Sequence, residues 1–244
     1  MSCFSAVTKD IFRWKIRKHK KQVVNICRHM ILGAGLIAGL MTATISGAMA
    51  NPEGGVVIGG SATITNTPTE LQINQSSDRA LIEWSSFNIN AGETTRFIQP
   101  NSGSIALNRV VNSNQLSSIN GNLIANGKVL VINPNGVLIG PNGNIDTNSF
   151  LATSADIDND AFMNSTGALQ FNKAGNIDAV VENRGSISVA AEGLAALVAP
   201  TVRNSGVIQG NLAKVQLAAA DTFAVDFYGD GLISYAVGSS NQQR

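Results

Sequence analysis

Beyond residue 50 the sequence contains neither cysteine nor histidine. Both cysteines (Cys3 and Cys27) and both histidines (His19 and His29) lie in the first fifty of its 244 residues. The rest of the chain therefore cannot form disulfides, and it offers no imidazole for general-base catalysis or metal binding. This excludes the commonest thiol and histidine centres from most of the protein.

Positive charge is also scarce in that part of the chain. Eight of the 17 basic residues fall in the first fifty positions, against Asp10 alone among the 16 acidic ones. The net charge of +1 thus hides a body with nine basic and fifteen acidic residues. Such a body is a poor partner for nucleic acid, and we expect no nucleic-acid binding.

The first fifty residues have the three parts of an extended signal peptide, which we expect to be helical. A basic region is followed by an apolar stretch and then by small residues at Ala48 and Ala50, which predicts cleavage before Asn51. An uncleaved anchor is the alternative, but the apolar stretch falls short of the roughly 20 residues that a span needs. We therefore divide the chain into the leader 1–50, a domain 51–238 and a polar tail 239–244.

The stretch from residue 126 to 145 organises the remainder. Two short runs rich in valine, leucine and isoleucine, residues 128–132 and 137–139, predict strands. Between them Asn133, Pro134, Asn135 and Gly136 have the residue preferences of a type I turn, and Gly140 to Gly143 repeats the pattern. Because these strands are continuously apolar, we expect both their faces to be covered.

Short strands and asparagine or glycine corners recur along the chain. The motif N-x-G-x-I begins at Asn183 and again at Asn204, 21 residues later, and residues 164–169 are a looser copy. Further strands are expected at 56–58, 62–64, 81–84, 87–89, 94–98, 104–111 and 123–124. Residues 151–163 are the expected interruption, with room for a short helical turn.

This periodicity favours a solenoid. A repeat of about 20 residues made of strands predicts an all-β parallel β-helix, and the twelve asparagines between 101 and 150 suit its corners. A β-sandwich rich in polar turns is the alternative fold.

Several motifs together resemble the two-partner secretion domains of filamentous haemagglutinin and the high-molecular-weight adhesins. They are residues 84–89 (WSSFNI), 95–100 (TRFIQP), 106–110 (ALNRV), 119–121 (ING), 126–127 (NG), 131–137 (VINPNGV) and 225–233. The resemblance covers roughly residues 55–237. No Asn-Pro-Asn occurs near residues 65–90, unlike in filamentous haemagglutinin, so the chain is more similar to the adhesin branch.

The resemblance implies a right-handed parallel β-helix with N-terminal capping strands, and a function in secretion. It implies export by the Sec machinery, recognition by periplasmic POTRA domains of an outer-membrane TpsB-type transporter, folding at the cell surface, and a secreted or surface location. It also implies a larger exoprotein whose downstream part, absent or very short here, would meet host receptors. We expect the chain to be a piece of such a protein.

Candidate site residues follow from these motifs. Asn133, Pro134, Asn135 and Gly136, with Asn108 and Arg109, are expected either to define the fold or to contact the transporter, and the turn-like sequence favours the first role. Trp84, Phe87 and Phe97 are expected in the core or under a cap.

Two other functions are compatible with the sequence. The chain could be a self-standing adhesive or structural surface module. It could also be a polysaccharide-acting enzyme or a Ca²⁺ binder through Asp156, Asp158 and Asp160, although Ala161 and Gly167 stand where an EF-hand needs glycine and glutamate. We expect no enzyme, no cofactor and no metal.

Overall fold

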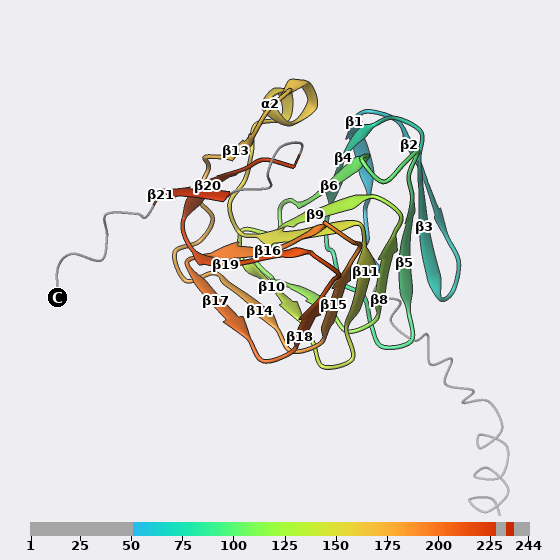
Figure 1. Cartoon of the computed structure of the whole chain (residues 1–244). Coiled ribbons are helices and arrows are strands. Elements are labelled where there is room, and N and C mark those ends of the chain that lie inside the picture. Colours follow the sequence, from blue (N-terminus) through green and yellow to red (C-terminus); the bar gives the residue numbers. More distant parts are fainter. Residues whose placement is uncertain (1–50, 228–232, 237–244) are drawn as a thin grey trace, which may run out of the picture. The chain divides into compact units, whose positions relative to one another are not determined.

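Short strands coil into a β-solenoid of about seven turns (Figure 1). The computed structural model describes residues 51–227 and 233–236. The predicted parallel β-helix with N-terminal capping strands is confirmed, and the β-sandwich is wrong. The predicted leader, with Ala48 and Ala50, and the polar tail 239–244 lie outside the described residues.

Three sheets form the solenoid. Sheet I has the order β1 (Val56–Gly59), β4 (Arg79–Trp84), β6 (Ile105–Val110), β9 (Lys128–Ile132), β12 (Ser149–Thr153), β16 (Leu194–Ala199) and β19 (Lys214–Ala219). Sheet II has the order β18 (Val207–Gln209), β15 (Ser186–Val189), β11 (Asn144–Thr147), β8 (Asn122–Ala125), β5 (Thr94–Ile98), β3 (Glu70–Gln75) and β2 (Ala62–Asn66). Sheet III has the order β17 (Thr201–Asn204), β14 (Val180–Asn183), β10 (Gly136–Ile139) and β7 (Ser117–Ile119).

Successive turns stack in parallel, and the first strands close the N-terminal end. A regular turn runs from sheet III to sheet II to sheet I, as in β7, β8 and β9. At the start of the domain β1 pairs antiparallel with β4, and β2 pairs antiparallel with β3. These antiparallel pairs are the expected capping strands.

Strand β9 of sheet I is covered on both faces, as its continuously apolar sequence predicted. The same expectation is wrong for residues 137–139 (β10), because Leu138 on the outer face of sheet III is only half-buried. In β9, Val129 and Val131 belong to the inner core, whereas Leu130 and Ile132 belong to a second cluster on the outer face, and all four are 0 % exposed. Alternate residues of a strand point to opposite faces, so one strand serves two cores.

The second core lies beneath an outer layer. We define the outer layer as residues 155–171, which contain helix α2 (Asn159–Asn164) and β13 (Leu169–Phe171), together with β20 (Thr222–Val225) and β21 (Ile233–Ala236). β13, β20 and β21 form a separate antiparallel sheet, which lies beside α2 at the upper left of Figure 1. The expected interruption thus contains a six-residue helix.

Two further local predictions are wrong. Residues 164–169 are not a copy of the repeat, because they belong to the outer layer. In the preceding turn of the solenoid, the position equivalent to Asn183 is occupied by Ile139, which pairs with it. Residues 87–89 form no strand: only Ile89 makes an isolated bridge, to Ile119.

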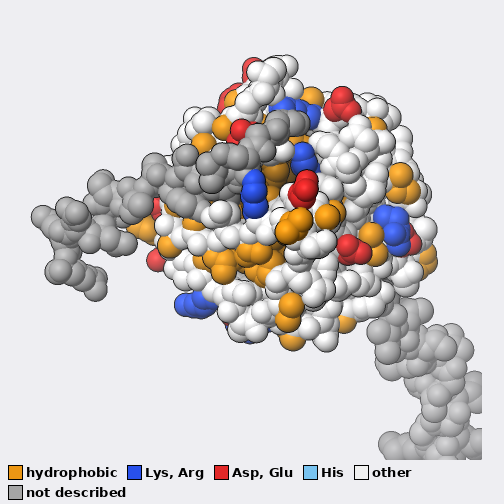
Figure 2. Space-filling view, in the orientation of Figure 1, with side chains coloured by type: hydrophobic (Ala, Val, Ile, Leu, Met, Phe, Trp, Pro, Cys, Tyr) orange, Lys and Arg blue, Asp and Glu red, His pale blue; other side chains and the backbone are white. Residues whose placement is uncertain are grey.

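The last described turn has exposed apolar side chains. Its inward Val215 and Leu217 are 45 % and 46 % exposed, and Figure 2 shows hydrophobic side chains gathered in this region. No helix among the described residues is long and apolar enough to cross a membrane.

Candidate functional site

The corner of residues 133–136 joins β9 to β10 and is held by its own amide groups. Gly136 N donates to the carbonyl of Asn133 at 2.8 Å, which closes the predicted turn, and Asn135 N donates to Asn133 Oδ1 at 2.9 Å. Asn133 Nδ2 donates to Gln115 O and Ser117 Oγ, both at 3.0 Å. Asn133 is 1 % exposed, so its side chain is committed to the fold.

The neighbouring residue of the corner ties two more segments to it. Asn135 Nδ2 donates to Ser113 O at 2.9 Å, and Asn135 Oδ1 accepts from Asn176 Nδ2 at 2.5 Å. Asn176 N also donates to Pro134 O at 3.0 Å. Pro134 and Asn135 are half-buried, so they are the corner's accessible residues.

Gly136 is required by both conformation and space. Its φ is +106°, and an added Cβ would lie 2.2 Å from the backbone oxygen of Val180 in the next turn. A side chain here would be strained and would also push the adjacent strand β14 away.

The three aromatics predicted in the core or under a cap belong to the inner core. Trp84 and Phe87 meet edge to face with ring centroids 5.8 Å apart, and Trp84, Phe87 and Phe97 are each 1 % exposed. Asn108, which is 0 % exposed, accepts a hydrogen bond from Trp84 Nε1 at 3.0 Å and donates to Leu130 O at 3.2 Å. From β6, the strand between β4 and β9, Asn108 therefore provides hydrogen-bond partners for the buried indole N–H of Trp84 in β4 and the backbone carbonyl of Leu130 in β9.

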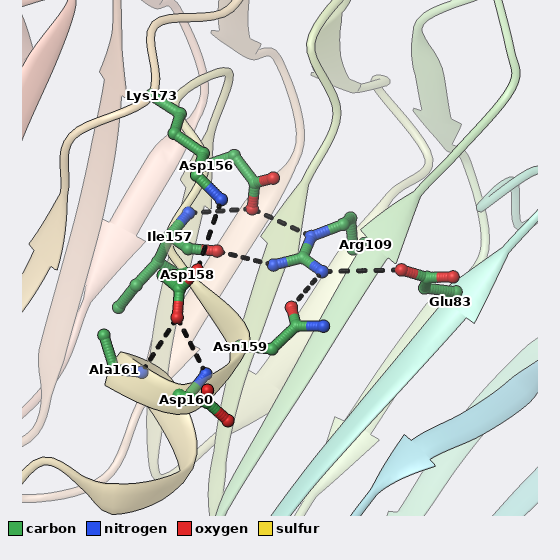
Figure 3. Close-up of polar contacts among 9 residues, drawn as sticks. All are labelled: Glu83, Arg109, Asp156, Ile157, Asp158, Asn159, Asp160, Ala161 and Lys173. Atoms are coloured by element: carbon green, nitrogen blue, oxygen red, sulfur yellow. Dashed lines mark hydrogen bonds and ion pairs between the residues drawn. The ribbon is translucent and has the colours of Figure 1, made fainter.

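Arg109 points to the opposite face of the same strand, where it holds the outer layer (Figure 3). Nε donates to Asp156 Oδ1 at 2.8 Å, NH2 donates to Ile157 O at 2.7 Å, and NH1 donates to Asn159 Oδ1 at 2.6 Å. Glu83 lies 3.5 Å from NH1. The guanidinium side chain is 9 % exposed, so these contacts replace most of its water.

The acidic cluster is divided between two tasks. Asp156 pairs with Arg109, whereas Asp158 caps α2 by accepting from Asp160 N at 3.0 Å and Ala161 N at 3.3 Å. The hydrogen bond from Ala161 N, followed by that from Asp160 N, holds the pKa of Asp158 below its usual value, and nearby Lys173 adds to the effect. Among the residues that the structure describes, no three His, Cys, Asp or Glu side chains are grouped to hold a metal ion.

Arg79 is a further residue of this region that the motifs did not reveal. Its NH1 donates to Phe162 O, its NH2 donates to Ser165 O at 2.6 Å, and its guanidinium lies 5.7 Å from the Phe162 ring centroid. Arg79 thus binds the carboxyl end of α2 while Arg109 binds the segment that leads into it. Nothing in the sequence around Arg79 distinguishes it from an arginine at an ordinary strand start.

Lys128 begins β9 on the outer face of sheet I. Its Nζ donates to Phe227 O at 3.2 Å and lies 5.8 Å from the centroid of that ring. Burial, and then the positive charge of Arg79, lower the pKa of Lys128. The lysine forms part of the contact between sheet I and the residues that follow β20.

Asn51, the residue that follows the predicted cleavage site, is already part of the fold. It is 2 % exposed, and its Oδ1 accepts from Thr95 Oγ1 at 3.2 Å. Cleavage before Asn51 stays a prediction.

Comparison with known proteins gives three findings. The family model described as the TPS secretion domain matches residues 43–242. The crystal structure of the HMW1 secretion domain from Haemophilus influenzae is similar at a TM-score of 0.68 and 34 % identity, over 78 % of this chain and 50 % of that chain. Two heme/hemopexin-binding proteins of H. influenzae are 41 % and 37 % identical over 108 and 116 residues, which are 44 % and 48 % of this chain. The aligned parts are only 12 % and 13 % of those relatives.

Proposed function

Because the chain belongs to the TPS secretion domain family, we propose that it directs an adhesin-like exoprotein to the POTRA domains of a cognate outer-membrane transporter. The protein would be exported through the periplasm and would start β-helix folding at the cell surface. The match to residues 43–242 carries this proposal, and the similarity to the HMW1 secretion domain supports it. Proteins of this family are typically secretion or adhesin proteins and not enzymes.

The named relatives suggest haem-related chemistry, which we assign outside this domain. Both relatives are heme/hemopexin-binding proteins, and this chain matches about an eighth of each. Residues 51–244 contain no histidine or cysteine, two of the usual protein ligands of haem iron. We therefore propose that this domain supplies export, and that any haem-related activity belongs to downstream parts of such exoproteins.

Folding at the surface can give export its direction. At roughly 0.1 kcal/mol per residue, a turn of about 20 residues contributes around 2 kcal/mol, which is several times the thermal energy. A folded turn outside the membrane would therefore oppose backward movement of the chain. Export at an unchanged rate by a variant whose turns cannot form would contradict this idea.

For the contact with the transporter we favour strand addition at the N-terminal end. β1 is the edge of sheet I, contains no charged residue or proline, and exposes Val56 by 58 % and Ile58 by 42 %. Edges of this kind accept an extended segment from a partner. At the 133–136 corner, by contrast, the side chains of Asn133 and Asn135 both make internal hydrogen bonds, which leaves half-buried Pro134 as the side chain free to touch a partner.

A matched pair of substitutions tests this contact. Val56→Lys places a charge on the edge strand β1, and Val207→Lys places the same charge at an equally exposed position, 56 %, on the edge strand β18 at the other end. We expect Val56→Lys to weaken capture by purified POTRA domains at least tenfold, and Val207→Lys to leave it unchanged. Pro134→Ala tests the corner, because it keeps the carbonyl that accepts from Asn176 N. A larger loss of capture there, in a variant of unchanged stability, would move the contact from β1 to the corner.

The function itself needs a separate experiment. A reporter fused behind residues 1–236 should reach the medium when the cognate transporter is co-expressed, and should stay in the periplasm when the POTRA domains are deleted. Equal release with and without those domains would refute the proposed function. The outcome does not depend on which surface makes the contact.

A further inference from the structure

The outer layer joins two segments that lie far apart in the sequence. β13 pairs with β20 so that Phe171 faces Phe223, and their rings stack 4.5 Å apart at an interplanar angle of 3°. Beneath them the outward residues of sheet I are buried to 4 % exposure or less: Leu81, Ile105, Leu107, Leu130, Ile132, Leu151, Leu194, Ala196 and Val198. This second core is complete only when residues 155–171 and 222–225 are both in place.

The earliest turns are tied to the outer layer by charged hydrogen bonds. Arg79 lies in β4 and Arg109 in β6, yet their guanidinium groups bind carbonyl, amide and carboxylate oxygens between residues 156 and 165. Three strands of sheet I (β6, β9 and β12) follow β4 before the chain reaches that segment. The contacts of both arginines therefore join segments that are several turns apart in the sequence, and Figure 3 shows those of Arg109.

We propose that the outer layer is a folding latch, which makes the first turns of the solenoid depend on residues 155–171 and 222–225. In a simple solenoid each turn contacts only its neighbours, so a defect stays local and folding can proceed turn by turn. Here the outer layer contacts β4 and β6 as well as β16 and β19, which couples the early and the late strands of sheet I. The described domain then folds as one cooperative unit.

The latch is a property of the folded domain and goes beyond the proposed function. One consequence of the latch, for export, rests on the proposed function. During export from the N-terminal end, the outer apolar face of sheet I would stay open until β20 has passed the membrane. The value of roughly 2 kcal/mol per turn is then an average over the domain. The early turns would oppose backward movement weakly, and most of the stability would arrive in one late step near residue 225.

The test uses the full chain with Trp14→Phe, which leaves Trp84 as the only tryptophan. Trp84 is 1 % exposed in the inner core of the early turns, so its fluorescence reports on them, while far-ultraviolet circular dichroism reports on the whole domain. Phe223→Ala perturbs the latch. Leu217→Ala is the control. Leu217 is close to Phe223 in the sequence, but it is 46 % exposed and lies outside the latch.

We expect Phe223→Ala to lower the urea midpoint reported by Trp84 by about 1 M or more, in step with the dichroism, and Leu217→Ala to change it little. If Phe223→Ala abolishes folding so that the native Trp84 emission is lost as well, the dependence of the early turns is equally demonstrated. The latch proposal would be overturned if the urea midpoint reported by Trp84 fluorescence in Phe223→Ala were unchanged while the dichroism lost amplitude at a lower urea concentration. No transporter is present in this experiment, so its failure would leave the proposed function untouched.

The arginines give a second, milder test. Arg79→Met should raise amide hydrogen exchange in both the 156–165 segment and β4 by the same factor, because one cooperative opening exposes both. Faster exchange confined to residues 156–165 would show that the outer layer opens alone, and would overturn the proposal.

Discussion

Replacement of Arg109 by methionine removes the polar centre of the outer layer while keeping most of the side-chain volume. The substitution deletes hydrogen bonds to Asp156, Ile157 O and Asn159, which measure 2.8, 2.7 and 2.6 Å. Breaking a buried charged pair from one side costs about 3–5 kcal/mol. Because the Asp156 and Glu83 side chains are 27 % and 31 % exposed, water can recover part of that loss. We therefore expect a decrease of about 2–4 kcal/mol in the free energy of unfolding.

The assay is equilibrium unfolding in urea, followed by circular dichroism. With a slope of about 2–3 kcal/mol per M, the expected decrease shifts the midpoint by about 1 M. Arg109→Lys keeps the charge but not the planar fork, so it should recover less than half of the loss. A double-mutant cycle with Asp156→Asn should show coupling of at least about 1 kcal/mol.

The control is Arg184→Met. Arg184 also makes two hydrogen bonds to a carboxylate, at 2.8 and 3.0 Å to Glu182, but its side chain is 51 % exposed. Solvent screens such a pair, so we expect no measurable shift of the midpoint. If Arg109→Met unfolds at the same urea concentration as Arg184→Met, the inference that Arg109 secures the outer layer is refuted.

Three further substitutions test other parts of the chain. Gly136→Ala should lower the free energy of unfolding by about 3 kcal/mol or more, because backbone strain at φ +106° adds to the 2.2 Å approach of the new Cβ to a backbone oxygen. Gly92→Ala is the control: its φ is +84° and nothing lies within 4 Å of an added Cβ, so it should cost only the strain. Equal costs for the two variants would contradict the steric argument. Asn108→Ala should lower stability by about 1–3 kcal/mol and change the emission of Trp84, whose indole N–H loses its acceptor; an unaltered spectrum would speak against that contact. The lowered pKa of Asp158 means that its stabilisation is present above its unfolded value of 3.8 and is lost as pH falls through the lower folded value. Asp158→Asn should therefore weaken the decline in urea midpoint below about pH 4, and an unchanged acid dependence would exclude this carboxylate as a contributor.

Much of the fold was determined by the sequence alone. The 21-residue spacing of Asn183 and Asn204 predicts stacked corners, and in the structure Asn183 Nδ2 donates to Asn204 Oδ1 at 2.8 Å. The continuously apolar strand 128–132 predicts cover on both faces, because an exposed face would demand alternation. Corner residues and strand patterns act over short distances, which is why they can be recognised without the structure.

The identity of what covers the outer face of sheet I was decided only by the tertiary structure. Residues 164–169 imitate the repeat because asparagine and glycine suit any tight turn, yet they belong to the outer layer. Arg79 is unremarkable in sequence, and the motif that contains Arg109 does not reveal what that residue contacts. Their partners Phe162 O and Asp156 lie 83 and 47 residues away. Pairing over such separations depends on how many strands the intervening chain places in sheet I, and no local pattern of residues encodes that number.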